Sequence, residues 1–258
     1  MKRFRFLSTR LFLLLFLFIT ATLTCSLPVS AKNLRVGLFI GTFDPFHAQH
    51  AELALKAKAE LGLDAVFVVP NSSNPKKTMM TSLSFRHRLI AAALRDIHDP
   101  ALFLLSKEDI KAADRSNNQT LFAYNIISLL KKRFSGATLY EILGSDSVEK
   151  VFNSGMPKPA DKVVLVVMVR PKTTLKEQPL LTRFKQQGLF VEITPGKVAL
   201  SSTEIRSAAK GGNIEFLRTH LSPSLYRELV FRGSYGLRQT LAWRPEVLRL
   251  IHEDRNHD

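Results

Sequence analysis

Cysteine is almost absent from this chain of 258 residues. The single cysteine, Cys25, lies inside an apolar N-terminal run from Leu11 to Leu27. One cysteine excludes an intrachain disulfide, so the fold has to be stabilised by core packing, for which 45% hydrophobic residues are ample. Internal repeats and low-complexity stretches are also missing outside the N-terminal run, which argues against a repeat architecture.

Acidic residues are scarce: 22 Asp and Glu stand against 37 Lys and Arg, a net charge of +15. The first 31 residues hold four of the basic residues and no acid, which leaves 33 against 22, or +11, for the rest. A basic surface suits polyanionic ligands such as nucleotides, although a solvated basic surface explains the excess equally well. Charge alone does not separate small-molecule nucleotides from nucleic acid or anionic lipid as partners; the family resemblance described below favours small-molecule nucleotides and makes nucleic acid the less favoured partner, and the oligomeric state stays open.

The N-terminus has the pattern of a targeting segment. A basic stretch over 1–10 precedes the apolar run 11–27, and Val29-Ser30-Ala31 resembles a small-residue cleavage site. This predicts a signal peptide over 1–31 that is cleaved on export to the periplasm or the exterior. The alternative is an uncleaved membrane anchor through 11–27. We then predict one domain over 32–236 and a basic, helical tail over 237–258.

The most informative stretch runs from Gly41 to His50. An apolar run, 36–40, precedes it and a helical run, 51–57, follows it, which is the strand–turn–helix unit of parallel α/β sheets. Ligands of such sheets lie at the carboxyl ends of strands, where helix N-termini favour phosphate. His47 and His50 can share one helical face and donate to successive phosphates. Alternatively, the turn is ordinary and the histidines are surface residues.

Other apolar runs predict further strands and helices along the chain. The strands are expected at 65–70, 101–105, 137–143, 163–169 and 189–193. Helices are expected to begin near 84, 120, 180, 202, 214 and 223, and residues 106–119 are expected to form a loop over the sheet. The sequence therefore predicts an α/β fold with a parallel sheet.

A second pattern, Leu200-Ser201-Ser202-Thr203-Glu204-Ile205-Arg206, predicts another helix N-terminus with hydroxyl groups. Arg206 lies one turn inside that helix, where its planar guanidinium can bind phosphate oxygens. The alternative is a plain capping box with Ser201 or Ser202 as the N-cap.

These motifs resemble those of the nucleotidylyltransferase superfamily, most closely the nicotinate/nicotinamide-nucleotide adenylyltransferases. Gly41 to His50 resembles the signature G-[TS]-F-[DN]-P-x-[HT]-x-G-H with Gln49 in place of its glycine, and 200–206 resembles I-S-S-T-x-I-R. Gly144-Ser145-Asp146-Ser147 resembles the G-x-D-S element. The resemblance implies a Rossmann-like parallel sheet with helices on both faces. It also implies transfer of AMP from ATP to nicotinate or nicotinamide mononucleotide, giving a dinucleotide and pyrophosphate, in the manner of NAD biosynthesis.

The resemblance also implies roles for individual residues. The catalytic groups would be His47, His50 and Arg206. The ATP-binding residues would be Gly41, Thr42, Phe43, His47, His50, Gly144, Asp146, Ser202, Thr203 and Arg206. Contacts to the acceptor nucleotide would come from Lys77, Arg88, Thr120 and Tyr124. Mg²⁺ would bridge phosphate oxygens with few protein ligands, so no metal-ligating residue is assigned.

Two alternatives remain at this point. The chain could belong to another branch of the superfamily that uses phosphopantetheine or CTP, although the form S-S-T-x-I-R favours the pyridine-nucleotide branch. It could also be an exported, non-catalytic protein that binds nucleotides or polyanions. Gln49 and the Lys76 that stands where the family has a loop histidine favour this second alternative.

Overall fold

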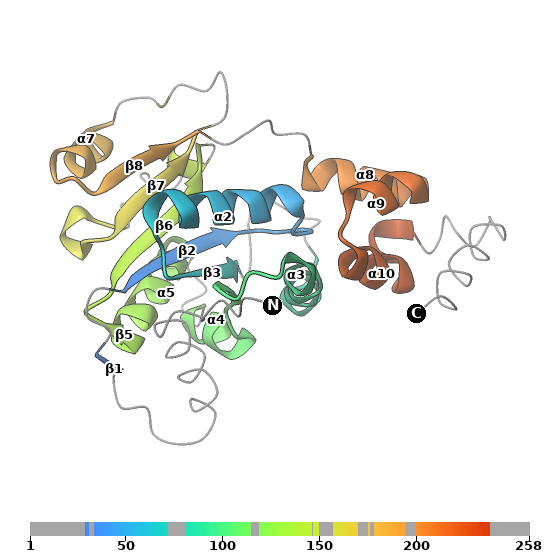
Figure 1. Cartoon of the computed structure of the whole chain (residues 1–258), viewed down its shortest axis with the longest axis horizontal. Coiled ribbons are helices and arrows are strands. Elements are labelled where there is room, and N and C mark those ends of the chain that lie inside the picture. The colour runs from blue at the N-terminus through green and yellow to red at the C-terminus, as the bar shows by residue number, and fades with distance from the viewer. Residues whose placement is uncertain are drawn as a thin grey trace, which may run out of the picture.

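The computed structural model describes residues 34–71, 81–114, 119–145, 147–149, 157–169, 175, 178–194 and 200–237, and the backbone of 29–30 (Figure 1). Residues 1–28 and 31 of the predicted leader (1–31), residues 238–258 of the predicted tail (237–258), Lys77 and Asp146 lie outside these residues. Val29–Ser30 (β1) pairs in parallel with Phe134–Ser135 (β5), so the predicted leader boundary falls just after a strand. None of the helices in the described ranges is both long and apolar enough to span a membrane.

Six parallel strands form the central sheet, which confirms the predicted fold class. In the order of the sheet they are β4 (Leu102–Leu104), β3 (Ala65–Pro70), β2 (Arg35–Gly41), β6 (Thr138–Gly144), β7 (Val164–Met168) and β8 (Phe190–Ile193). The chain builds outward from β2 to β4 on one side and then from β6 to β8 on the other. The strand order therefore reverses between β2 and β6, and ligands of open α/β sheets bind at the carboxyl ends beside such a point.

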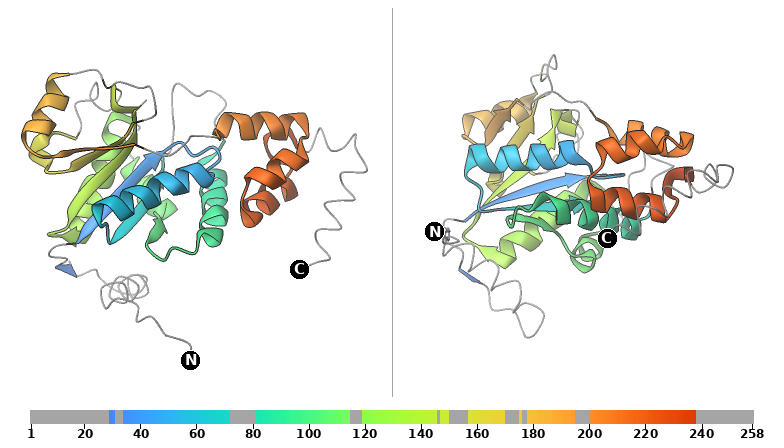
Figure 2. Two further views of the ribbon diagram at one scale, coloured as in Figure 1. Left: turned by 45° about the horizontal axis from the view of Figure 1, so that its top comes forward. Right: turned by 45° about the vertical axis from the view of Figure 1, so that its right-hand side comes forward.

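Helices cover both faces of the sheet (Figures 1 and 2). They are α2 (Ala48–Leu61), α3 (Leu83–Ile97), α4 (Lys107–Ala113), α5 (Gln119–Arg133), α7 (Pro179–Gln186), α8 (Ser202–Gly211), α9 (Ile214–His220) and α10 (Pro223–Phe231), with 3₁₀ turns η1 (Pro159–Asp161) and η2 (Ser234–Gly236). Buried side chains of α2, α3 and the C-terminal helices share one apolar cluster with β2, β3, β6 and β7. Helices α4 and α5, and separately α7, form clusters with the opposite face.

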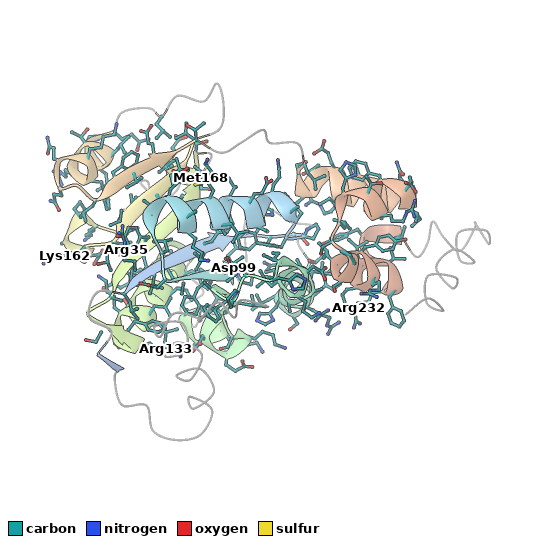
Figure 3. All side chains as sticks on the ribbon, in the orientation of Figure 1. Arg35, Asp99, Arg133, Lys162, Met168 and Arg232 are labelled. Atoms are coloured by element: carbon teal, nitrogen blue, oxygen red, sulfur yellow. The ribbon has the colours of Figure 1, made fainter. Side chains whose placement is uncertain are left out.

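The loop predicted over 106–119 is wrong for its first half, because helix α4 begins directly after Ser106. The Ser106 side chain accepts a hydrogen bond from the Asp109 backbone N–H at 3.0 Å, and Ile110 and Ala113 are buried. Arg133, which Figure 3 labels, ends α5 and donates two hydrogen bonds to the Asp109 carboxylate, at 2.9 and 3.0 Å. A charged segment of seven residues is too short to show helical periodicity clearly in the sequence. The helix is stabilised by its N-cap and by its contact with α5.

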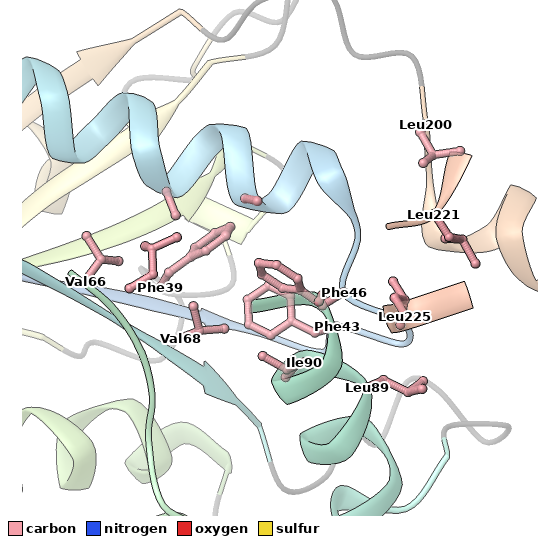
Figure 4. Close-up of a cluster of buried hydrophobic side chains, with 14 of the residues drawn as sticks. Phe39, Phe43, Phe46, Val66, Val68, Leu89, Ile90, Leu200, Leu221 and Leu225 are labelled. Carbon is pink, nitrogen blue, oxygen red and sulfur yellow. The ribbon is translucent and has the colours of Figure 1, made fainter. Parts of the chain in front are cut away.

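The C-terminal helices lie beyond the carboxyl ends of the strands, where β2 points (Figure 2). Phe43 and Phe46 lie between α2 and Ile90 of α3, and leucines of the C-terminal helices continue the same cluster (Figure 4). The turn after β2 is thus part of the core as well as the edge of the sheet. This placement brings the second motif, at the start of α8, to the first motif, at the start of α2.

Candidate active site

The turn after β2 is fixed by close packing between Gly41 and Phe43. A Cβ atom on Gly41 would lie 2.7 Å from the Phe43 ring, which a real side chain does not tolerate. Phe43 has a φ of 47° and is 4% exposed, and its ring lies 5.1 Å from that of Phe39 and 5.3 Å from that of Phe46. A ligand can therefore reach Phe43 only through its main chain, so the predicted contact of this residue with ATP cannot involve the ring.

His47 and His50 lie together at the N-terminus of α2, as the sequence predicts. His47 is the N-cap residue, and its backbone N–H donates to Nδ1 of His50 at 3.3 Å. The two ring centroids are 3.9 Å apart, and the His50 ring stacks on Phe46 at 5.4 Å. Because Nδ1 of His50 accepts this bond, its proton lies on Nε2 in the neutral form. Nε2–H of His50 is then a donor suited to a phosphate oxygen.

His47 is buried, at 4% exposure, and its Nδ1 atom has no hydrogen-bond partner within the described part of the chain. Burial lowers the pKa of His47 to about 4, and the nearby carboxylate of Glu204 opposes this only in part. The side chain is therefore neutral at pH 7 in the free protein. A buried polar atom without a partner at a helix N-terminus is the arrangement expected for a group that receives an anionic ligand.

The second motif forms the N-terminus of α8, with Ser201 as the N-cap. The side chain of Ser201 accepts from the Glu204 backbone N–H at 3.2 Å, and the Glu204 carboxylate accepts from the Ser201 backbone N–H at 2.7 Å. The capping box considered from the sequence is therefore present. It leaves the first-turn N–H groups of Ser202 and Thr203 without acceptors inside the helix.

Two side chains of α8 connect the second motif to the first. The Ser202 hydroxyl donates to the Pro45 carbonyl at 2.9 Å, and Nη1 of Arg206 donates to the Asp44 carbonyl at 2.7 Å. Nη2 of Arg206 donates to the Thr203 hydroxyl at 3.1 Å. The structure thus brings the two predicted phosphate-binding motifs together, and in the free protein these side chains also hold the turn after β2.

Gln49, which departs from the family signature, adds a third connection. Its Oε1 atom accepts from the Leu200 backbone N–H at 3.1 Å, across 151 residues of sequence. Leu200 is 7% exposed and directly precedes the N-cap of α8. The side chain that replaces the family's glycine therefore satisfies a buried backbone group, so this departure preserves the pairing of the motifs.

Arg86 is a positioning residue that the sequence analysis missed. It is fully buried and donates to three backbone carbonyls, those of Thr42 at 2.6 Å, Asn71 at 2.7 Å and Thr81 at 3.1 Å. It thereby connects the ends of β2 and β3 to the start of α3. Helical periodicity could have predicted the burial of Arg86, because position 86 lies on the same helical face as the buried Leu89, Ile90 and Ala93.

Replacing Arg86 by methionine is expected to lower the free energy of unfolding by about 3–5 kcal/mol, because three buried carbonyls lose their donor. Chemical denaturation measures this loss. Arg88→Met is the matched control. Arg88 is exposed, and its Nε atom lies 3.7 Å from Oε1 of Glu228 in α10; this ion pair is expected to contribute at most about 1 kcal/mol to stability. Equal losses in both variants would contradict the role given to Arg86.

The remaining predicted residues are placed as follows. Gly144 ends β6, next to the end of β2 in the sheet, and the backbone of Thr120 lies in the first turn of α5. Tyr124 is half-buried one turn further along α5, and Arg88 lies on α3 facing Glu228. The structure brings the residues predicted for the first and second motifs together. The contacts predicted for the acceptor nucleotide remain predictions.

Comparison with known proteins agrees with this geometry. A sequence profile of the cytidylyltransferase-like family matches residues 38–208. A relative from Thermoanaerobacter sp. named "Probable nicotinate-nucleotide adenylyltransferase" is 30% identical over 191 residues, covering 70% of this chain and 85% of the relative. One of the same name from Rubrobacter xylanophilus is 28% identical over 209 residues, covering 78% and 92%.

A solved structure has the same fold. Nicotinic acid mononucleotide adenylyltransferase of Plasmodium falciparum, complexed with NaAD, superimposes with a TM-score of 0.61 at 17% identity, covering 80% of this chain and 98% of that one. The paired motifs, the strand order and the family match lead to one conclusion: the chain belongs to the cytidylyltransferase-like family and, within it, to the nicotinate-nucleotide adenylyltransferases.

Proposed function

We propose that this protein transfers AMP from ATP to nicotinate mononucleotide and so forms nicotinate adenine dinucleotide and pyrophosphate. The observation that carries the proposal is the meeting of His47 and His50 with the start of α8 at the carboxyl edge of the sheet. The names of the relatives support nicotinate, rather than nicotinamide, as the base of the acceptor. They also favour this reaction over CTP- or phosphopantetheine-dependent transfer and over a non-catalytic binding role.

The chemistry needs no protein nucleophile. A phosphate oxygen of the acceptor bonds to the α-phosphorus of ATP, and the bond from that phosphorus to the α–β bridging oxygen breaks, with its electron pair leaving on pyrophosphate. Such transfers depend on positioning and on neutralising charge. His47 would stabilise the charge that develops at the α-phosphate. His50, the first turn of α8 and Arg206 would hold the departing β- and γ-phosphates.

Mg²⁺ would enter this site with the nucleotide. In the part of the chain that the structure describes, no group of three or more His, Cys, Asp or Glu side chains is arranged to hold a metal ion. The carboxylate of Asp44, the buried acid of the first motif, already accepts hydrogen bonds from Thr81 and Tyr235. This donor set suits an ion coordinated mainly by phosphate oxygens and water, whose role when bound is to neutralise the triphosphate.

The purified protein is expected to form a dinucleotide from ATP, Mg²⁺ and nicotinate mononucleotide, with pyrophosphate released in equal amount. Chromatography of the products and a coupled pyrophosphate assay measure the two yields, and nicotinamide mononucleotide serves as the competing acceptor. A faster reaction with nicotinamide mononucleotide would reassign the acceptor. Binding of ATP without any dinucleotide would support the non-catalytic alternative.

A further inference from the structure

The last described turn of the chain returns to the turn after β2. In η2 the hydroxyl of Tyr235 donates to Oδ1 of Asp44 at 2.7 Å, across 191 residues of sequence. The same 3₁₀ turn packs against α8, the helix that carries the second motif. Neither residue was assigned a role from the sequence.

Asp44 is a buried junction, at 4% exposure. Its carboxylate accepts from the Thr81 hydroxyl at 2.6 Å and the Thr81 backbone N–H at 3.2 Å, in addition to Tyr235. Its main-chain carbonyl accepts from Arg206 at 2.7 Å. Asp44 therefore receives bonds from the start of α3, from α8 and from the C-terminal turn, three residues before His47.

The backbone of Tyr235 is strained, and its surroundings hold it in place. Its φ of 57° and ψ of 33° lie in the left-handed region, which is unfavourable for an aromatic residue. Besides the bond to Asp44, its ring meets that of Phe85 edge-on at a centroid distance of 5.9 Å. Strain of this kind persists where surrounding contacts over-determine a conformation, and it clusters at functional sites. Burial and the charge of Asp44 raise the pKa of Tyr235, so its hydroxyl stays a donor at neutral pH.

We propose that Tyr235 is a positioning residue for adenylyl transfer. Its hydroxyl fixes Asp44, and Asp44 in turn sets the turn that presents His47 and accepts the guanidinium of Arg206. The activity part of this inference rests on the proposed function. The end of the domain is then part of the nucleotide site although it lies in no recognised motif. Loss of one hydroxyl should misplace the reacting groups more than it unfolds the protein.

The test is Tyr235→Phe, which removes the hydroxyl and keeps the ring. We expect kcat for dinucleotide formation to fall about 10- to 100-fold, the range for losing a hydrogen bond to a charged group, while KM for the acceptor changes less than threefold. Tyr140→Phe is the matched control, because Tyr140 lies on β6 against Arg35 and outside the site. It is expected to keep native kcat. A native kcat in Tyr235→Phe, with only a lower melting temperature, would overturn the proposal.

A double-mutant cycle tests the route through Asp44. In an Asp44→Ala background both carboxylate oxygens are removed, so the Tyr235 hydroxyl has lost its acceptor. Tyr235→Phe should then lower kcat by less than threefold further, whereas an independent role would give the full loss again. Calorimetric titration with ATP separates this inference from the proposed function. If the native protein binds ATP but forms no dinucleotide, the proposed function fails. In that case weaker ATP binding by Tyr235→Phe would still support the positioning role of Tyr235, and unchanged ATP binding would overturn it.

Discussion

Replacing His47 by asparagine is expected to lower the rate of dinucleotide formation by about 10²- to 10⁴-fold, the range for removing a group that stabilises transition-state charge. The fold should survive, because asparagine is among the best N-cap residues and keeps α2 capped. The buried Nδ1 atom of His47 has no hydrogen-bond partner in the described ranges, so replacing the ring breaks no bond at that atom. Product chromatography measures the rate, and circular dichroism confirms the fold.

The matched control is His98→Asn. His98 is exposed at the C-cap of α3 with a φ of 52°, a conformation that asparagine tolerates. This variant should keep native activity. Full activity in His47→Asn would remove His47 from the reaction, and equal losses in the two variants would indicate a general effect of the substitution.

The low pKa of His47 gives this residue a second, distinguishing property. The side chain is neutral above about pH 4 in the free protein, and a bound phosphate favours its charged form. ATP binding near pH 6 is therefore expected to take up protons and to tighten as the pH falls. Calorimetry in two buffers of different ionisation enthalpy measures the uptake. Uptake that persists unchanged in His47→Asn would assign the proton to another group.

Replacing Glu141 by glutamine is expected to stabilise the protein more and more as the pH rises. Glu141 lies in the middle of β6 at 1% exposure, between Leu38 of β2 and Leu165 of β7 in the register of the sheet. Its Oε2 atom has no hydrogen-bond partner among the described residues. Burial raises the pKa of Glu141 to about 8, so the folded protein keeps this carboxyl protonated at pH 7.

The direction of the effect follows from proton linkage. Between pH 4.5 and 8 the unfolded chain has lost this proton and the folded chain has kept it, so the free energy of unfolding falls as the pH rises. The slope is about 1.4 kcal/mol per pH unit, or about 2 kcal/mol between pH 6.5 and 8. Glutamine cannot ionise, so the gap between the variant and the native protein should widen by that amount.

The window above pH 6.5 avoids the titration of His47, whose lowered pKa changes stability only between about 4 and 6.5. Urea denaturation at three pH values across the window measures the gap. Glu60→Gln is the control, because Glu60 is exposed near the end of α2 and pairs with Lys56. Curves for Glu141→Gln and the native protein that stay parallel would mean that Glu141 is ionised in the folded state.

Local pattern was a good guide to the elements of the sheet. The apolar run over 65–70 matches β3 residue for residue, and the other predicted strands agree to within one or two positions. The missed helix α4 is short and charged, and it is stabilised by its cap and its contact with α5. The sequence did not predict the burial of Glu141 either. Its position in a strand does not show which face of the sheet it lies on or which residues cover it.

The sequence by itself determined which segments become strands, where two phosphate-binding helices begin and which family the motifs resemble. These features depend on residues close together in the chain, where period, caps and turn residues act directly. Only the tertiary structure decided that the Phe43 ring is core, that Gln49 holds Leu200, and that Arg86 joins the ends of two strands. It alone brought Tyr235 to Asp44. Contacts across 151 to 191 residues arise when helices close over the sheet edge, and no local pattern encodes which distant donor will meet a buried carbonyl or carboxylate.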